Sequence, residues 1–426
     1  MTFDYSNVLI LGYGASGKSV ENVLKYIGVD YDIYDENIIH KYNILNKITN
    51  KNLKLYDLAV LSPGISIYSK IVNRLKKCGV KVISEIEFAY LFSLGYIIAV
   101  TGTNGKTTTV NLINHILTKS GVDTELVGNV GTPFSDKCML ENKVFVVEVS
   151  SFQLEAIEYF RPNIAVLLNI APDHIERHKS YKNYMSSKFK IFQNQTECDT
   201  AIVSRDVLID NYLDDVKSDI NIIMSKGINI EDGCIYVYND NDRIKVCEMS
   251  DILHINTAME NILASILTCF LYGVNVRDIM YALQTYVPPK QRCEVVKIEN
   301  NITYINDSKS TNIHSMIYAV NTYKHRDICL MLGGFDKKLD FVDFIAHIPN
   351  NIYHIVLFGP AGKRIAKLCK KYHIQNYTYC EKLINAIQCA KANARENSVV
   401  LFSPANSSFD EFSSYIERGK FFENNI

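Results

Sequence analysis

Short runs of apolar residues alternate along the chain with stretches in which apolar residues recur at helical spacing. The first run, Asn7–Leu11, is continuous enough to be a buried strand. It is followed by Val20, Val23 and Leu24 on one face of an expected helix, which Gly28 would end. Strands that alternate with helices build parallel sheets that helices cover on both faces, so the pattern predicts an α/β fold.

Two further series of apolar runs follow the first. The second has strand-like segments at 97–100, 144–149 and 164–168, and the third has them at 302–305, 328–332, 355–358 and 399–402. The breaks between the series predict a Rossmann-like domain over residues 1–93, a central domain over 94–295 and a second Rossmann-like domain over 296–426. Because ligands of open α/β sheets gather at the carboxyl ends of the strands, we expect functional residues in the loops there.

The composition narrows the class of partner. The 426 residues are 47% hydrophobic and 21% charged, with a net charge of −1 and no long basic block, which predicts neither a nucleic-acid nor a membrane partner. The eleven cysteines stand singly without a CxxC pair, and the N-terminus lacks the features of a signal peptide. We therefore expect a cytoplasmic protein with small-molecule partners.

The strongest local motif is a short phosphate loop, Thr101-Gly-Thr-Asn-Gly-Lys-Thr-Thr108, between a strand-like run and an expected helix. Its glycines let backbone N–H groups face phosphate oxygens, Lys106 adds a positive charge, and Thr107 can bind Mg²⁺. The alternative is a plain glycine-rich turn. The motif predicts a central domain of the P-loop ATPase type with these ATP contacts: Gly102, Thr103, Asn104, Gly105, Lys106, Thr107 and Thr108.

A second glycine-rich segment, Gly12-Tyr-Gly-Ala-Ser-Gly17, follows the first strand and matches a dinucleotide fingerprint, with Asp35 placed to bind a ribose. This pattern leaves open a nicotinamide-dependent oxidoreductase. The same geometry would hold any diphosphate, including that of a uridine nucleotide. Further along, the segment Ser62-Pro-Gly-Ile65 could be a plain turn.

The phosphate loop, the glycine-rich first domain and the segment Asp307-Ser-Lys-Ser-Thr-Asn312 together resemble the Mur ligase family of peptidoglycan synthesis. The resemblance covers the whole chain. Four further segments are most similar to the members that add D-glutamate to UDP-N-acetylmuramoyl-L-alanine: Ser62-Pro-Gly-Ile65, Val149-Ser-Ser-Phe-Gln-Leu154, Leu332-Gly-Gly-Phe-Asp-Lys337 and Ser403-Pro-Ala-Asn-Ser-Ser408. It implies a uridine-nucleotide domain, a central ATPase and a C-terminal domain that brings the amino acid.

The resemblance also implies a site for two Mg²⁺ ions, with Thr107, Glu148, His174 and Lys188 as ligands. Lys188 matches the position at which the family carries a carbamylated lysine, a CO₂ adduct that turns a cation into an oxygen ligand. From the residues alone, Glu148 could instead be a salt-bridged core glutamate, His174 a helix cap and Lys188 a surface lysine.

Other roles implied by the resemblance lie in the third domain. Arg292 and Lys309 would reach the ATP phosphates and Asp307 the ribose side, and the catalytic set would be Lys106, Lys188, His174 and Lys309. Arg292 could also be a solvated arginine after Pro288-Pro289. In the adenine region only Asn261 matches the family, because Thr257-Ala258 stands where a His-Asn pair is usual.

The substrate contacts complete the implied site. D-Glutamate would be held by Thr311, Lys337, Ser408 and Tyr415, and the muramoyl substrate would contact Asn129; the uridine pocket would be lined by Gly14, Ala15, Ser16, Asp35 and Glu36. Two plainer interpretations compete here, since Lys337 could belong to a solvated loop and Asn129 to a turn.

The activity that follows from the resemblance is ATP-dependent ligation of D-glutamate to UDP-N-acetylmuramoyl-L-alanine through an acyl phosphate, by an enzyme that we expect to be a monomer. A carboxylate is a poor acylating agent, so ATP must first convert it to an acyl phosphate that an amine can attack. The rivals are a sister ligase that adds another amino acid and the nicotinamide-dependent oxidoreductase. The oxidoreductase would leave Lys106 and Lys309 unexplained.

Overall fold

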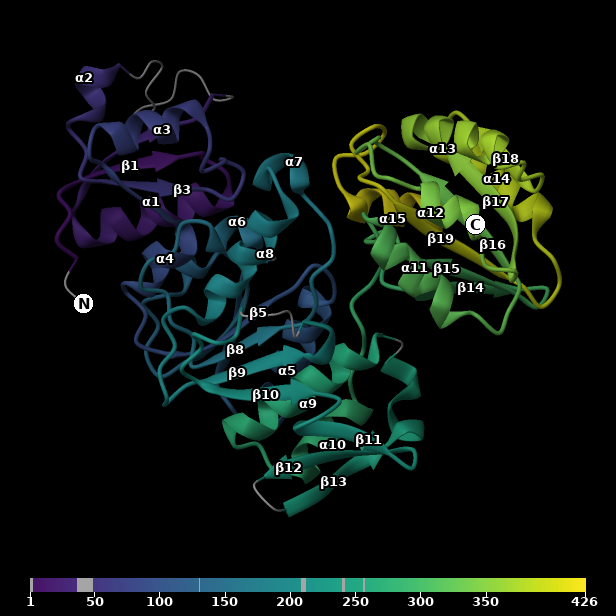
Figure 1. Ribbon diagram of the computed structural model, residues 1–426, viewed down its shortest axis with the longest axis horizontal. Helices are drawn as coiled ribbons and strands as arrows, with labels where there is room; N and C mark the ends of the chain where they lie inside the picture. The colour runs from purple at the N-terminus through teal and green to yellow at the C-terminus, as the bar shows by residue number, and fades with distance from the viewer. Residues whose placement is uncertain (1–2, 37–48, 130, 208–211, 240–241, 256) are drawn as a thin grey trace. The chain divides into compact units, whose positions relative to one another are not determined.

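The computed structural model describes residues 3–36, 49–129, 131–207, 212–239, 242–255 and 257–426, and in them the apolar runs form three sheets with helices packed against them (Figure 1). The α/β prediction is therefore confirmed. By their contacts the residues divide into two compact units, Met1–Tyr286 and Val287–Ile426. The first two sheets belong to the first unit and the third sheet to the second.

The first sheet has the strand order β2-β1-β3-β4 and is parallel throughout. Its strands are β1 (Asn7–Leu11), β2 (Asp30–Tyr34), β3 (Leu58–Leu61) and β4 (Lys81–Ser84), and its helices are α1 (Ala15–Ile27), α2 (Asn50–Leu53), α3 (Lys70–Lys77) and α4 (Glu85–Tyr90). Val20, Val23 and Leu24 of α1 are buried as predicted. Gly28 ends this helix in the left-handed conformation, at φ 71°, which glycine adopts without strain.

The second sheet has the order β13-β12-β11-β10-β9-β8-β5-β7-β6 among the described residues. Its strands are β5 (Tyr96–Thr101), β6 (Thr124–Gly128), β7 (Val144–Glu148), β8 (Ile164–Leu167), β9 (Thr200–Ser204), β10 (Asp219–Ile223), β11 (Gly227–Glu231), β12 (Cys234–Asn239) and β13 (Asp242–Glu248). The α-helices of this region are α5 (Lys106–Lys119), α6 (Ser151–Leu154), α7 (Ile175–His178), α8 (Tyr181–Phe189), α9 (Met259–Tyr272) and α10 (Val276–Gln284), and the 3-10 helices are η1 (Phe134–Asp136), η2 (Lys190–Phe192), η3 (Arg205–Val207) and η4 (Met249–Ile255). Every residue of β7 is buried, as expected for a strand covered on both faces.

One part of the second sheet departs from the expected alternation of strands and helices. Between residues 219 and 248 the structure has four consecutive strands, and β11-β12-β13 are joined antiparallel. The prediction of alternation throughout was wrong here. In β12 the inward residues are Ile235 and Val237, which alternate with less buried neighbours. This strand is therefore covered on one face only and needs no helix on the other.

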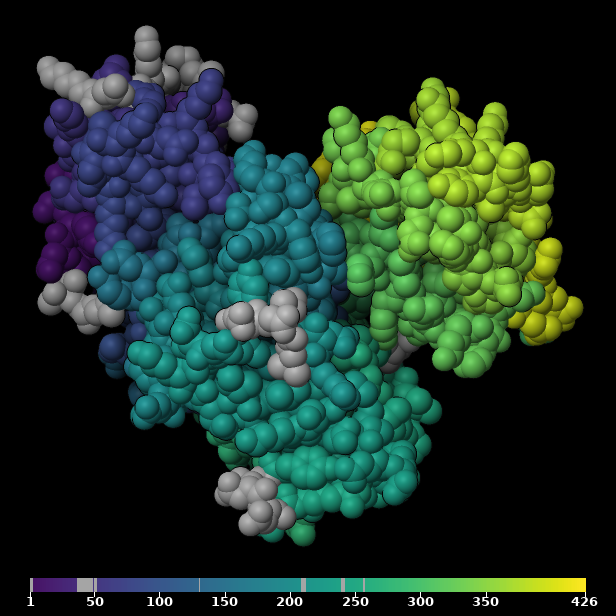
Figure 2. Space-filling view, viewed as in Figure 1, coloured from purple at the N-terminus to yellow at the C-terminus, as the bar shows by residue number. Residues whose placement is uncertain are grey.

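The third sheet has the order β14-β15-β19-β16-β17-β18 and is parallel except for the β14-β15 hairpin. Its strands are β14 (Glu294–Glu299), β15 (Ile302–Asn306), β16 (Ile328–Gly333), β17 (Ile352–Phe358), β18 (Tyr377–Cys380) and β19 (Val399–Ala405), and its helices are α11 (Ile313–Thr322), α12 (Val342–Ala346), α13 (Gly359–Lys371), α14 (Leu383–Asn393) and α15 (Tyr415–Asn425). Asn300 and Asn301 form the hairpin turn at φ 50° and 61°, a conformation that asparagine tolerates. In the space-filling view, side chains cover this sheet on the face shown (Figure 2).

Among the described residues, no single helix is long and apolar enough to cross a membrane. The pair η4 and α9 passes the same test together but is bent by 110°. Most of α9 is buried.

The buried strand β7, which pairs with β5 and β6, gives a direct test of the packing in the first unit. Phe145 is fully buried and its ring centroid lies 5.1 Å from that of Phe134. We expect Phe145→Ala to lower the free energy of unfolding by about 3–5 kcal/mol, because the removed ring leaves a cavity that the paired strands cannot fill. Urea titration of the full chain measures the effect. Leu94→Ala, at a side chain that is 82% exposed, is the matched control and should change stability by less than about 0.5 kcal/mol; equal losses in both variants would contradict this packing.

Candidate active site

The phosphate loop lies between β5 and α5, as predicted. Gly105 occupies the position before the helix with φ 84°, and a Cβ there would lie only 2.1 Å from Oδ1 of Asn261 on α9. This position therefore requires glycine for its conformation and for space. Asn169 fastens the loop from the other side, because its side chain accepts from the N–H of Asn104 at 2.8 Å and donates to the carbonyl of Asn104 at 3.2 Å.

Two lysines donate hydrogen bonds to one carbonyl oxygen of this loop. The Nζ atoms of Lys106 and Lys188 each lie 2.7 Å from the Gly102 oxygen, and Lys106 also reaches the Thr103 carbonyl at 3.0 Å. Burial, and then the neighbouring charge of Lys106, hold the pKa of Lys188 well below its usual value. The surface position that sequence alone suggested for Lys188 was wrong, since this side chain is 1% exposed.

Lys188 makes no ion pair with any carboxylate among the residues that the structure describes, although Asp173 and Glu148 influence it electrostatically. A buried amine without an anionic partner is costly in its charged form. The pair Lys106 and Lys188 therefore fits either an anion bound at the loop or a neutral Lys188.

Glu148, at the end of β7, is a buried carboxylate with one oxygen still available. Its Oε1 accepts from Nδ2 of Asn129 at 3.0 Å, whereas its Oε2 is buried with no hydrogen-bond partner in the described structure. A buried carboxylate oxygen of this kind needs a cation or a donor. The geometry fits a hard divalent cation better than it fits the salt-bridged core glutamate that sequence alone also allowed.

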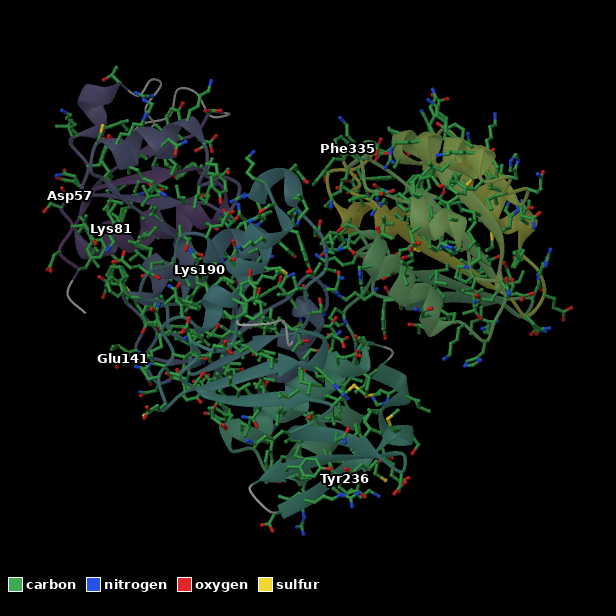
Figure 3. All side chains as sticks on the ribbon, in the orientation of Figure 1. Asp57, Lys81, Glu141, Lys190, Tyr236 and Phe335 are labelled. Carbon is green, nitrogen blue, oxygen red and sulfur yellow. The ribbon has the colours of Figure 1, made fainter. Side chains whose placement is uncertain are left out.

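His174 is the N-cap residue of the single-turn helix α7, with φ 54°. It therefore occupies the cap position that sequence alone suggested, but its side chain makes no capping hydrogen bond. Its Nε2 is 3.7 Å from Oδ2 of Asp173, and its ring lies against Phe152. Thr107 is half-buried in the first turn of α5. Lys190, just beyond α8 and labelled in Figure 3, does not share the Gly102 contact of Lys188, because its Nζ donates to the Glu155 carbonyl.

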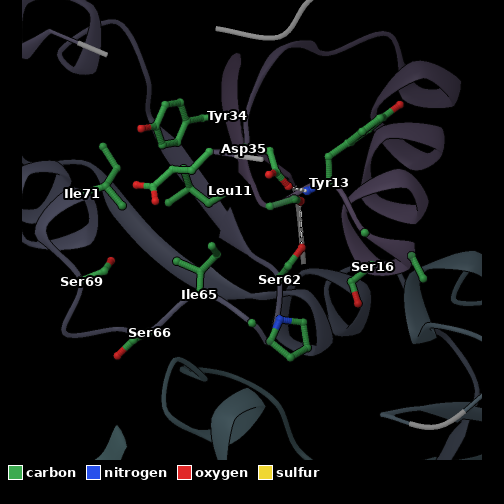
Figure 4. Close-up of a pocket in the computed structure, with 16 residues that line it drawn as sticks. Leu11, Tyr13, Ser16, Tyr34, Asp35, Ser62, Ile65, Ser66, Ser69 and Ile71 are labelled. Carbon is green, nitrogen blue, oxygen red and sulfur yellow. Dashed lines mark hydrogen bonds between the residues drawn. The ribbon is translucent and has the colours of Figure 1, made fainter. Parts of the chain in front are cut away.

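A pocket of about 540 Å³ lies at the carboxyl edge of the first sheet (Figure 4). Gly14, Ala15, Ser16, Asp35 and Glu36 all line it. The glycine fingerprint has the expected mechanical role, because Gly12 has φ 85° and a Cβ at Gly17 would lie 2.1 Å from the Gly12 carbonyl oxygen. The Tyr13 N–H donates to the Asp35 carboxylate at 2.8 Å. The segment Ser62-Pro-Gly-Ile65 also lines the pocket, with Ser62 donating to the Gly12 carbonyl.

In the second unit, Asp307 follows β15 and is buried. It accepts from the N–H of Cys293 at 3.3 Å and from Oγ of Ser403 at 2.7 Å, and burial raises its pKa to about 7. Arg292 is close enough for its charge to oppose that rise. Nζ of Lys309 lies 4.0 Å from the centroid of the Tyr415 ring.

The other residues predicted to hold the amino acid lie on neighbouring loops of the same sheet edge. Nζ of Lys337, after β16, donates to the carbonyl of Thr311 at 3.2 Å, and Ser408, after β19, is 2% exposed. A contact between Lys337 and Thr311 joins two loops, so Lys337 is not a freely solvated loop lysine. The structure thus brings these predicted residues to one end of the third sheet.

Sequence analysis missed a group of interacting side chains behind α7. Arg177 donates to the carbonyls of Pro63 and Ile65, at 2.6 and 3.1 Å, and pairs with Glu155 at 3.1 Å. Glu155 lies 3.1 Å from Nδ1 of the buried His178. The only sequence signal was the charged cluster Glu176-Arg-His178, which is equally typical of a solvated helical turn.

Known proteins resemble this chain along nearly its full length. Residues 100–269 match the Mur ligase middle domain, and residues 291–406 match the Mur ligase glutamate ligase domain. A UDP-N-acetylmuramoylalanine–D-glutamate ligase of Alkaliphilus oremlandii (strain OhILAs) is 32% identical over 447 residues, which cover 99% of this chain and 98% of the relative. One of Thermoanaerobacter sp. (strain X514) is 34% identical over 441 residues, which cover 98% and 97%.

Solved structures share the fold at lower identity. The UDP-N-acetylmuramate–alanine ligase of Thermotoga maritima has a TM-score of 0.58 at 18% identity, covering 99% of this chain and 98% of that one. A MurF ligase of the same species in complex with ADP has a TM-score of 0.58 at 14% identity, covering 99% and 95%. The chain therefore belongs to the Mur ligase family and is an ATP-dependent enzyme that forms an amide bond.

Proposed function

We propose that this chain joins D-glutamate to UDP-N-acetylmuramoyl-L-alanine, in the cytoplasm and as a monomer, in peptidoglycan precursor synthesis. The observation that carries the proposal is the match, over almost the whole chain, to relatives named as ligases of this specificity. We further propose the three domains 1–93, 94–295 and 296–426 for the nucleotide sugar, ATP and the amino acid. The three separate sheets support this division.

In the first step the alanyl carboxylate attacks the γ-phosphorus of ATP, which gives ADP and an acyl phosphate. The residues Gly102–Thr108 would hold the ATP phosphates at the N-terminus of α5, and Lys106 would stabilise the charge on the transferring group. Asn261 lies against Gly105 of the phosphate loop, which supports a place for it beside the nucleotide, and Arg292 and Lys309 would add positive charge. Asp307 would contact the ribose side.

Mur ligases use Mg²⁺, and the residues present fit it. The unpartnered buried oxygen of Glu148 supports a cation at the end of β7, with Thr107 and His174 as further ligands and Asn129 orienting both Glu148 and the muramoyl substrate. When bound, Mg²⁺ would neutralise negative charge on the ATP phosphates during transfer of the γ-phosphoryl group. We propose two ions.

A carbamate on Lys188 would complete this ligand set. The neutral amine would attack CO₂, forming an N–C bond and releasing one proton, so that an uncharged nitrogen becomes a carboxylate-like anion. Burial favours the neutral amine that this addition needs. The adduct would also provide Lys106 with an anionic neighbour, which Lys188 itself does not.

In the second step the amine of D-glutamate attacks the acyl carbon, and the tetrahedral intermediate collapses to the amide and phosphate. D-Glutamate carries two carboxylates, and Lys337 and Ser408 offer a cation and a hydroxyl group at the carboxyl ends of strands in the third sheet. Thr311 and Tyr415 would complete this pocket. The diphosphate and sugar of the other substrate would occupy the pocket at Gly14, Ala15 and Ser16, with Asp35 and Glu36 beside the uridine.

A test of the specificity is phosphate release by the purified chain with ATP, Mg²⁺ and UDP-N-acetylmuramoyl-L-alanine. We expect release only when D-glutamate is added, because D-glutamate is the amino acid named for the relatives that match nearly the whole chain. L-Glutamate, L-alanine, L-lysine and meso-diaminopimelate are the controls. Release with one of these instead would assign a sister reaction, and no release with any amino acid would overturn the proposal.

The role of Lys106 predicts a large kinetic effect. We expect Lys106→Ala to lower kcat by about 10²–10³-fold, because it removes a preorganised charge from the transferring phosphoryl group. Steady-state phosphate release measures this loss. Lys119→Ala, at the exposed last turn of the same helix, is the matched control and should leave kcat unchanged.

The carbamate predicts a chemical signature at Lys188. After incubation with ¹³C-bicarbonate we expect a carbamate carbon resonance in the wild-type chain that Lys188→Ala lacks, together with a loss of activity of about 10²-fold or more that acetate partly restores. Lys182→Ala, at an exposed lysine of the same helix, should keep both the resonance and the activity. An identical spectrum in the Lys188 variant, or full activity without acetate, would rule the carbamate out.

A further inference from the structure

A single buried arginine lies beneath the loops that carry the proposed amino-acid-binding residues. Arg418, on α15, has no solvent-exposed surface and is the largest fully buried side chain of the described structure. No motif in the sequence marked it. Its position one turn after Tyr415 places its guanidinium under the carboxyl ends of β15 and β19.

The guanidinium joins two of these loops directly. Nε and Nη2 donate to Oγ and the carbonyl oxygen of Ser308, at 3.1 and 2.9 Å. Nη1 donates to the carbonyls of Asn406 and Ser407, at 3.0 and 2.9 Å. Ser308 precedes Lys309, and Ser407 precedes Ser408. One rigid planar group therefore fixes the distance between the backbones that carry these two side chains.

The loop after β16 packs on the same group. A Cβ at Gly334 would lie 2.9 Å from Nη1 of Arg418 and 2.5 Å from the Ser407 carbonyl oxygen. The N–H of Phe335, labelled in Figure 3, donates to that same carbonyl at 3.0 Å. The loop that leads to Lys337 is therefore seated against the Arg418 site.

Burying the charged guanidinium of Arg418 has an unfavourable desolvation free energy. It forms no ion pair with a carboxylate among the described residues, and burial lowers its pKa to about 10, which still leaves it charged at neutral pH. An apolar side chain of similar volume would cost less to bury. What an apolar residue cannot supply is a set of hydrogen bonds that reaches three backbone carbonyls and a hydroxyl from one plane.

We propose that Arg418 is a positioning residue for the incoming amino acid, holding the loops of Thr311, Lys337 and Ser408 in register for a ligand with two carboxylates. Tyr415 belongs to the same arrangement, because Oγ of Ser308 donates to its carbonyl at 2.9 Å. The inference rests on the proposed function for the identity of the ligand, but not for the role of Arg418 in holding the loops.

The same sheet offers a matched control at its opposite edge. Arg326 donates to Oγ1 of Thr303 at 2.9 Å and to the carbonyls of Asn397 and Ser398, each at 3.0 Å through Nη2. It thus joins the amino ends of β15 and β19 as Arg418 joins their carboxyl ends. Replacing the guanidinium of Arg326 should lower the free energy of unfolding without altering the loops that carry the amino-acid-binding residues.

The kinetic test compares Arg418→Lys with Arg326→Lys in the full chain. We expect Arg418→Lys to raise the KM for D-glutamate about tenfold or more and to leave the KM for UDP-N-acetylmuramoyl-L-alanine within about twofold, because lysine keeps the charge and loses the fork. Arg326→Lys should change neither KM. Unchanged KM values in the Arg418 variant, or an equal rise in both variants, would overturn the proposal.

A second measurement does not depend on the reaction. Hydrogen exchange of the ligand-free chain should become faster in segments 306–311, 333–337 and 403–408 of Arg418→Lys and should stay unchanged there in Arg326→Lys. If the wild-type enzyme did not use D-glutamate, the proposed function would fail while this measurement still decided the role of Arg418. Unaltered exchange in all three segments would overturn that role.

Ser308→Ala provides a milder variant in case Arg418→Lys does not fold. It removes only the hydroxyl that links Arg418 to the Tyr415 carbonyl. We expect a smaller rise in the KM for D-glutamate in the same direction, about threefold. No rise in this variant, together with unaltered exchange at 306–311, would count against the proposal.

Discussion

Two lysines share one carbonyl oxygen, and much of the first unit is arranged around this fact. Lys106 and Lys188 both donate to Gly102, and because Lys188 is buried and Lys106 half-buried, water screens their charges from each other only in part. Such an arrangement is stable only if one amine is neutral or if anions lie close by. Anionic groups can come from three sources: phosphates bound at the loop, the carboxylate of Glu148 and the proposed carbamate. A site with two lysines and room for such anions is suited to phosphoryl transfer.

The fold meets the requirement because parallel strands end together. Gly102 follows β5, Glu148 ends β7, and the loop that contains His174 follows β8, so three neighbouring strands of one sheet deliver these groups to a single edge. In the third sheet, the loops after β15, β16 and β19 likewise bring the proposed amino-acid-binding residues to one end of parallel strands. Each half of the proposed chemistry therefore depends on loops at the carboxyl ends of parallel strands, together with residues of α8 in the first unit and of α15 in the second.

The sequence predicted those features whose physical cause is local. The helix α1 and its Gly28 cap follow from periodicity and glycine conformation, and the phosphate loop follows from its glycines and Lys106. The burial of Lys188 was not predictable, because the buried residues of α8 mix polar and aromatic side chains and so mark no apolar face: Tyr184, Ser187, Lys188 and Phe189. Arg418 was hidden for another reason. Its partner Ser308 lies 110 residues away, and hydrogen bonds to backbone carbonyls leave no pattern of side chains to detect.

Lys188 and Arg418, two deeply buried cationic side chains in the described part of the chain, differ in how readily they lose a proton. Burial holds the pKa of Lys188 well below its usual value, which favours the neutral, nucleophilic amine that the proposed carbamate needs. Arg418 keeps its proton even though burial lowers its pKa, and its planar fork holds several acceptors at once. Exchanging the two residue types should therefore remove both proposed roles: an arginine at position 188 could not lose its charge, and a lysine at position 418 could not span the loops.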